Sequence, residues 1–214
     1  MIDVQEQERL FIAVGDILEK KIIVYAIGGT AMMFRNIKDA TLDIDLVFDR
    51  PGDREEFISA LKKLGSKDSD VTLVYGLKKN TPIMRELGSA RFDLFMNKII
   101  TSEFSENMKK RANQTHEFGK NLIIKVASPQ DILIMKSATS RIKDLEDILS
   151  IIKKNVINWE EVIEGAQEQV NLGNELAILS LGENLEKLND QKEINIPEVV
   201  KKLWKMLEKQ MNKC

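Results

Sequence analysis

Hydrophobic and polar residues follow one another along this chain in patterns that predict both helices and strands. Residues 4–20 place apolar side chains at helical spacing and predict an amphipathic helix. Short apolar runs that are typical of buried strands follow at residues 22–27, 42–48, 71–75, 90–96 and 122–127. A further helix is predicted over residues 53–64, after the turn signal of Pro51 and Gly52. The stretch 97–120 is polar and shows no pattern that assigns it.

The pattern changes at Ser128. A serine is a good helix N-cap, and Pro129 suits the first helical turn. Beyond this point the apolar spacing is helical throughout, and we predict helices over residues 129–138, 141–154, 158–171, 173–188 and 197–212. The chain is therefore predicted to be an α+β protein with two domains, a mixed α/β domain over residues 1–127 and a helical domain over residues 128–214.

The composition is that of an ordinary globular protein, with 43% hydrophobic and 31% charged residues among 214. No apolar run approaches the roughly 18 residues that a membrane span needs. Acidic residues near the start of the chain do not suit a signal peptide. We therefore expect a cytoplasmic protein that has no membrane partner. A formal net charge of −2 gives no general attraction for nucleic acid.

Two aspartates interrupt the apolar run 42–48. Asp43 and Asp45 are two residues apart, so on a strand their carboxylates share one face while Ile44 and Leu46 point to the other. Neighbouring carboxylates repel each other unless a cation lies between them. Mg²⁺ prefers carboxylate oxygens and completes its shell with substrate phosphates, so we interpret the pair as a metal and triphosphate site. The alternative is a strand edge with two solvated aspartates.

A glycine pair precedes this acidic pair. Gly28, Gly29 and Thr30 follow the predicted strand 22–27, and a helix is predicted to begin at Thr30. Glycines let the backbone approach a ligand closely, and the N–H groups of a helix start, together with a threonine hydroxyl, can bind an anion. Phosphate is the expected occupant, although glycine pairs also mark ordinary turns. The sequence contains neither the dinucleotide-binding glycine motif nor the P-loop motif.

A third aspartate, Asp93, lies in the apolar run 90–96. If this strand lies beside the strand 42–48, the three carboxylates can form a two-metal site. The alternative is a local pair with Arg91, which lies two residues away on the same strand face.

Charged residues also gather at the start of the helical region. On an unbroken helix Lys136, Lys143 and Asp147 fall on one side. Arg141 points elsewhere on such a helix, and it can turn inward only if the helix breaks between residues 137 and 140. The alternative is a solvated helix face with an ion pair between Lys143 and Asp147.

These residues resemble the signature of the nucleotidyltransferases of the DNA polymerase beta superfamily. That signature is a Gly-Gly or Gly-Ser turn, a paired acidic strand and a third strand carboxylate, and its matches here are Gly28, Gly29, Asp43, Asp45 and Asp93. Thr30 stands where the family often has serine and keeps the hydroxyl. The later residues Lys136, Arg141, Lys143 and Asp144 are similar to the Lys, Arg, Lys-Asp motif of the AbiE-type and MenT-type toxin nucleotidyltransferases.

The resemblance implies a mixed-sheet nucleotidyltransferase domain followed by a C-terminal helical bundle, and transfer of a nucleoside monophosphate from an NTP to a hydroxyl. Asp43 and Asp45 would hold Mg²⁺, or Mn²⁺, against the triphosphate, and Asp93 would bind a second ion or act as a base. Phosphate oxygens would be held by Gly28, Gly29 and Thr30. Lys136, with Arg141 or Lys143, would neutralise the leaving pyrophosphate, and Asp144 would orient these groups or take a proton.

The acceptor is open at this point. An RNA end, tRNA included, or a protein side chain suits the toxin of a toxin–antitoxin pair, with the antitoxin as a partner. One alternative is a small-molecule nucleotidyltransferase of the aminoglycoside-modifying kind. Another is a nucleotidyltransferase scaffold that binds ATP, GTP or a partner protein without turnover.

Overall fold

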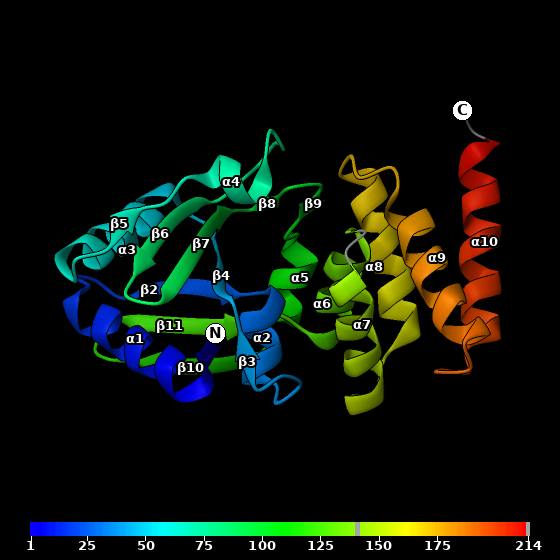
Figure 1. Cartoon of the computed structure of the whole chain (residues 1–214). Coiled ribbons are helices and arrows are strands. Elements are labelled where there is room, and N and C mark those ends of the chain that lie inside the picture. The colour runs from blue at the N-terminus through cyan, green and yellow to red at the C-terminus, as the bar shows by residue number, and fades with distance from the viewer. Residues whose placement is uncertain (140–141, 213–214) are drawn as a thin grey trace. The chain divides into compact units, whose positions relative to one another are not determined.

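The computed structural model describes residues 1–139 and 142–212 of the chain. The chain divides into two compact units, Met1–Ser128 and Pro129–Cys214, whose elements are labelled in Figure 1. The first unit holds all the strands of the described residues, and the second is helical. Among the described residues, none of the helices is both long and apolar enough to cross a bilayer.

A seven-stranded mixed sheet forms the centre of the first unit (Figure 1). Its strands lie in the order β10 (Gln114–Phe118), β11 (Leu122–Val126), β2 (Ile22–Ala26), β4 (Asp43–Phe48), β7 (Ala90–Met96), β6 (Ile83–Leu87) and β5 (Lys67–Asp68). The pairs β11–β2 and β4–β7 are parallel, and the other neighbours are antiparallel. The strands predicted at 22–27, 42–48, 90–96 and 122–127 are thereby confirmed.

Helices and two short strand pairs complete the first unit. The helices are α1 (Val4–Ile17), α2 (Gly28–Phe34), α3 (Pro51–Lys63), α4 (Val71–Tyr75) and α5 (Glu106–Arg111). The short pairs are β1 (Ile2–Asp3) with β3 (Ala40–Thr41), and β8 (Lys98–Ile99) with β9 (Ser102–Glu103). The helices predicted over residues 4–20 and 53–64 correspond to α1 and α3 and are confirmed.

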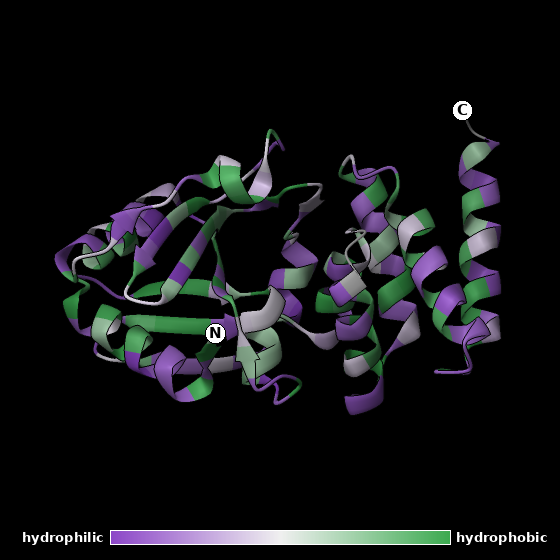
Figure 2. Ribbon diagram, viewed as in Figure 1, coloured by the Kyte–Doolittle hydropathy of each residue, from purple (hydrophilic) through white to green (hydrophobic). Residues whose placement is uncertain are grey.

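Helices α1 and α3 cover one face of the sheet. Phe57 of α3 packs against Phe48 of β4 and Phe92 of β7, with ring centroids 5.4 and 6.1 Å away, and α1 contacts α3, β10 and β11. Figure 2 shows β2 and β11 as hydrophobic strands within this core. Because strand side chains alternate between faces, Phe48 and Phe92 point toward α3, and the odd-numbered residues of β4 and β7 point to the opposite face.

The strand predicted at residues 71–75 is wrong, because this segment is the short helix α4. Asp70 caps the helix, since its Oδ1 accepts hydrogen bonds from the backbone N–H of Thr72 at 2.8 Å and from the Thr72 hydroxyl at 2.6 Å. Gly76, whose φ is 62°, ends it. Leu73 and Val74 are exposed, so the apolar run does not enter the core. A local cap therefore outweighs the strand propensity of Val71 and Val74.

The second unit is a set of five helices among its described residues. They are α6 (Pro129–Ser137), α7 (Ile142–Lys154), α8 (Trp159–Asn171), α9 (Ala177–Asp190) and α10 (Pro197–Met211). These confirm the five predicted helices, with α9 beginning four residues later than predicted. Apolar side chains such as Leu181, Leu185 and Leu203 are buried where α9 packs against its neighbours. Figure 2 shows the corresponding stripes of hydrophobic and hydrophilic residues on these helices.

Candidate active site

Three carboxylates lie together on the face of the sheet that points away from α3. In the parallel pair of β4 and β7, Asp45 lies opposite Asp93, and Asp43 lies opposite Arg91. One carboxylate oxygen from each of Asp43, Asp45 and Asp93 lies within 4.8 Å of the other two. Asp93 is fully buried, and the two residues of β4 are partly exposed. Such a set of oxygen donors fits the coordination preference of Mg²⁺ or Mn²⁺.

The glycine turn meets the acidic strand at Asp45. Helix α2 begins at Gly28, two residues before the predicted start, and Gly28 has a φ of 54°. A Cβ atom added to Gly28 would overlap Oδ2 of Asp45 and lie 3.2 Å from its Cγ. The backbone N–H of Ile27 donates to the carbonyl oxygen of Asp45 at 3.2 Å. Gly28 is therefore the residue that leaves room for the Asp45 carboxylate.

Thr30 does not face solvent, as a phosphate ligand would. Its side chain is fully buried, and its Oγ1 accepts a hydrogen bond from the backbone N–H of Asp45 at 2.9 Å. The hydroxyl thus links the first turn of α2 to the acidic strand. In this structure Thr30 therefore holds the backbone that carries Asp45, and its expected role toward phosphate oxygens stays a prediction.

Arg91 and Tyr75 both bind the buried carboxylate of Asp93. Nε of Arg91 donates to Oδ1 of Asp93 at 2.9 Å, and Nη2 donates to Oδ2 at 3.0 Å and also to Oδ2 of Asp43. The Tyr75 hydroxyl donates to Oδ2 of Asp93 at 2.6 Å. The ion pair of Arg91 with Asp93, predicted as the alternative to a metal site, is therefore present within the carboxylate cluster itself. Tyr75 was not among the predicted site residues, since residues 71–75 were predicted to be a strand.

The charges of this cluster perturb one another. Burial raises the pKa of Asp93, and the hydrogen bonds from Tyr75 and Arg91 lower it by less. Burial and the charges of Asp45 and Asp93 raise the pKa of Tyr75 far above its ordinary value, so the phenol stays protonated. Burial alone would lower the pKa of Arg91, but its contacts with Asp93 and Asp43 raise it. The carboxylates of Asp43, Asp45 and Asp93 thus gather negative charge around the Arg91 guanidinium, and a metal ion can offset such charge.

A second charged cluster lies within the helical unit. Nζ of Lys136 contacts Oδ1 of Asp144 and Oδ2 of Asp147, each at 2.8 Å, and the Thr139 hydroxyl donates to Oδ2 of Asp144. Burial would lower the pKa of Lys136, but Asp144 and Asp147 raise it. Both aspartates are buried, so the alternative of a solvated pair between Lys143 and Asp147 is wrong, and Lys143 is exposed. The predicted role of Arg141 falls outside the described residues.

Comparison with known protein families agrees with the acidic cluster. The family described as "Nucleotidyltransferase of unknown function (DUF6036)" matches residues 1–177 of the chain. The chain belongs to this family. This nucleotidyltransferase therefore carries within the matched residues both its carboxylate cluster and the Lys136 cluster, since the match extends to Ala177 at the start of α9.

One solved structure that resembles this nucleotidyltransferase is the crystal structure of ANT(2″)-Ia in complex with adenylyl-2″-tobramycin. The two chains are 14% identical, the alignment covers 85% of this chain and 98% of that chain, and the TM-score is 0.47. No curated protein matches the chain.

Lys136 of the nucleotidyltransferase offers a direct test of its role. We expect Lys136→Met to destabilise the helical unit by about 3–5 kcal/mol, because it removes a cation that is paired with two buried carboxylates, those of Asp144 and Asp147. Urea denaturation followed by far-UV circular dichroism would measure this loss. Lys153→Met is the matched control on α7, since Lys153 is 53% exposed where it pairs with Glu193, and such exposed pairs contribute about 0–1 kcal/mol.

Unchanged stability of Lys136→Met together with lost nucleotidyl transfer would show instead that Lys136 acts on the substrate, as the sequence motif predicts. Loss of both stability and transfer would show that Lys136 holds α6 against α7. The two results separate because stability and transfer are measured on the same preparation.

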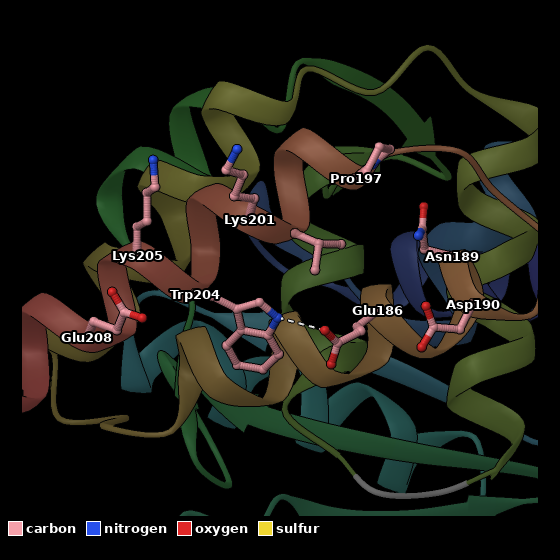
Figure 3. Close-up of a pocket in the computed structure, with 9 residues that line it drawn as sticks. Glu186, Asn189, Asp190, Pro197, Lys201, Trp204, Lys205 and Glu208 are labelled. Carbon is pink, nitrogen blue, oxygen red and sulfur yellow. Dashed lines mark hydrogen bonds between the residues drawn. The ribbon is translucent and has the colours of Figure 1, made fainter.

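A cavity of about 410 Å³ lies between α9 and α10 of the helical unit. Figure 3 shows Trp204 of α10 beside Glu186 of α9, to whose Oε1 the indole N–H donates at 2.9 Å. The Trp204 ring also lies against Gly182, where an added Cβ would come within 3.0 Å of it. Lysines and acidic residues line the cavity in similar numbers. Neither positive nor negative side chains therefore dominate the cavity. Trp204 packs α10 on α9.

Proposed function

We propose that this protein is a Mg²⁺-dependent nucleotidyltransferase that moves a nucleoside monophosphate from an NTP to a hydroxyl of an RNA end, such as a tRNA end, or of a protein side chain. The strongest support is the meeting of Asp43, Asp45 and Asp93 within 4.8 Å beside the Gly28 turn. Three carboxylates at this spacing bind hard divalent ions, Mn²⁺ included, and such ions bridge triphosphate oxygens.

Each candidate site residue of the first unit has a distinct role in this proposal. Asp43 and Asp45 would hold the metal ion that the triphosphate also binds, and Asp93 would hold a second ion or take the acceptor proton. The backbone N–H groups of Gly28 and Gly29 lie in the first turn of α2, where such groups have no intrahelical partner and suit a phosphate oxygen. Thr30 positions Asp45 through its hydrogen bond to the Asp45 backbone N–H. The bound metal supplies charge that stabilises the developing phosphate anion.

The transfer step exchanges one bond for another at the α-phosphorus. The acceptor hydroxyl oxygen forms a bond to this phosphorus, the bond to the bridging oxygen breaks, and pyrophosphate leaves with the electron pair. The acceptor proton passes to a carboxylate such as Asp93 or to water. The acceptor oxygen, the α-phosphorus and the leaving oxygen must lie in line for this exchange. The residues around Asp43 and Asp45 must therefore hold the acceptor and the triphosphate in this geometry.

Basic residues of the helical unit belong to the same proposal. Lys136, with Arg141 or Lys143, would neutralise the pyrophosphate, and Asp144 would orient Lys136 through their 2.8 Å contact. Lys136 already contacts two carboxylates, so this role requires a triphosphate to compete with Asp144 and Asp147 for its charge. Kinship with the AbiE-type and MenT-type toxins and an antitoxin partner rest on the sequence motif alone. The proposed cytoplasmic location rests on the acidic start of the chain and its lack of a membrane-length apolar run.

Transfer of label from NTPs labelled at the α-phosphate tests the proposal. The protein is incubated with each NTP, Mg²⁺ and one of three acceptor sets: total cellular RNA, proteins including the chain itself, or aminoglycosides and other small hydroxyl compounds. We expect labelled RNA or protein, with no label when EDTA removes the metal. Intact mass of the chain after the reaction separates self-modification from transfer to another molecule.

Each contrary outcome points to a named alternative. Label on small acceptors alone would identify a small-molecule nucleotidyltransferase. A rise in melting temperature with Mg²⁺ and NTP, but no product with any acceptor set, would identify a scaffold that binds nucleotide without turnover. If there is no thermal shift and no product, both the enzyme and the nucleotide-binding alternative are contradicted.

A further inference from the structure

Arg91 lies where a bound cation is expected. Its Nη2 donates to Oδ2 of Asp43 and Oδ2 of Asp93, and its Nε donates to Oδ1 of Asp93. The guanidinium thus bridges two of the three carboxylates that form the candidate metal site. An arginine side chain does not lose its proton in a protein, so this positive charge is permanent. Any divalent ion that reaches Asp43 and Asp93 must compete with it.

The two ends of this bridge differ in exposure. Asp93 has no exposed surface, whereas the side chains of Arg91 and Asp43 are each 23% exposed. Asp93 binds Arg91 through two N–H groups and also accepts a hydrogen bond from the Tyr75 hydroxyl, while Asp43 binds Arg91 through Nη2. The Asp93 end is therefore the fixed end, and the Asp43 end is the one that can open toward solvent.

We propose that Arg91 holds the place of the metal ion until nucleotide arrives, and that its guanidinium then leaves Asp43 and pairs with the triphosphate. This inference rests on the proposed function, because NTP is the ligand that it requires. A divalent ion and a guanidinium repel each other at shared carboxylates. The triphosphate removes the conflict, since it binds the ion and also offers arginine a strong bidentate partner. Metal and nucleotide therefore strengthen each other's binding by the same factor.

Replacement of Arg91 tests this coupling without any measurement of transfer. Mn²⁺ binding is measured by electron paramagnetic resonance, and binding of a non-hydrolysable NTP at saturating Mn²⁺ is measured by calorimetry. We expect Arg91→Met to bind Mn²⁺ alone about tenfold more tightly, because a repelling charge is gone. We expect the same variant to bind the nucleotide about tenfold more weakly, because a phosphate partner is gone. Loss of structure would weaken both, so opposite changes identify competition.

Two further variants complete the test. Arg91→Lys keeps the charge and loses the planar fork, so Mn²⁺ alone should bind as weakly as to the wild type, and the nucleotide should bind more weakly. Arg9→Met is the matched control, since Arg9 is exposed on α1, and both of its affinities should equal those of the wild type. The wild type itself should bind Mn²⁺ more tightly when the nucleotide is present, which needs no variant to fold.

The outcomes separate this inference from the proposed function. If Arg91→Met binds Mn²⁺ alone no more tightly than the wild type, Arg91 does not compete with the metal and the inference is wrong. If the wild type binds metal and nucleotide without coupling, the inference fails and the proposed function stands. If the wild type binds neither, both are wrong.

Discussion

Asp45→Asn is expected to reduce nucleotidyl transfer by roughly a thousandfold or more in kcat, since the charge stabilisation that a bound metal provides amounts to several kcal/mol. Asparagine has nearly the same size as aspartate, so the hydrogen bond from the backbone N–H of residue 45 to Thr30 and the pairing with β7 should persist. The change removes one charge from the carboxylates of Asp43, Asp45 and Asp93. Asp45 is preferred for this test because replacing Asp43 or Asp93 also removes a partner of Arg91.

The control for this substitution is Asp16→Asn, an exposed aspartate on α1, which should leave transfer unchanged. Initial rates with labelled NTP are compared at the same Mg²⁺ concentration, and melting temperatures confirm that each variant is folded. Near wild-type transfer by Asp45→Asn would show that Asp45 is no metal ligand in the reaction. An equal loss by Asp16→Asn would show that the loss is not specific to the carboxylate cluster.

The central strands could be predicted because their side chains alternate simply. In β4, Phe48 packs on α3 and the buried Ile44 and Leu46 alternate with Asp43 and Asp45. This alternation of apolar and charged residues specifies both the strand and the face that bears the carboxylates. That β7 lies beside β4 could not be predicted and was only assumed, since strand order depends on contacts between segments far apart in the chain.

Other strands have no such signal. β10 is an edge strand of the sheet and pairs with β11 alone, so its residues alternate between partial burial and exposure and its sequence is polar. β6 carries the buried Arg85, which binds Asp68 and Ser66. A charged residue in the middle of a strand masks it from a hydrophobic pattern until its partners are known. For this reason residues 97–120 and 83–87 stayed unassigned.

The candidate site shows the same division. The positions of Asp43, Asp45 and Asp93 on strands follow from the sequence. The sequence also predicts two alternatives for Asp93, a metal ligand or a partner of Arg91. The structure shows that these alternatives share one place, because Arg91 bridges Asp93 to Asp43. Tyr75 could not be predicted, since its hydroxyl reaches Asp93 only because Asp70 starts a helix there. The sequence shows which residues are near one another along the chain, whereas this cluster is formed by α4, β4 and β7, which are far apart in it.

Gly28→Ala is expected to lower kcat/KM for transfer by about a hundredfold, because a displacement of about 1 Å at a reacting group costs that much. The added Cβ overlaps Oδ2 of Asp45, and a carboxylate can rotate or shift away, so the fold survives while the metal ligand moves. Gly28 also has a φ of 54°, and an alanine in this conformation costs about 1–2 kcal/mol. Initial rates with labelled NTP and urea denaturation curves measure the two effects.

Gly88→Ala separates the strain from the displacement. Gly88 has a φ of 61°, close to that of Gly28, but nothing lies within 4 Å of its added Cβ. The two variants should therefore lose similar stability, because they bear the same backbone strain, and only Gly28→Ala should lose transfer. Binding of Mn²⁺ in the presence of the non-hydrolysable NTP should weaken in Gly28→Ala alone. If both variants keep full transfer, the carboxylate of Asp45 does not need the place that Gly28 leaves for it, and the glycine serves only the turn from β2 into α2.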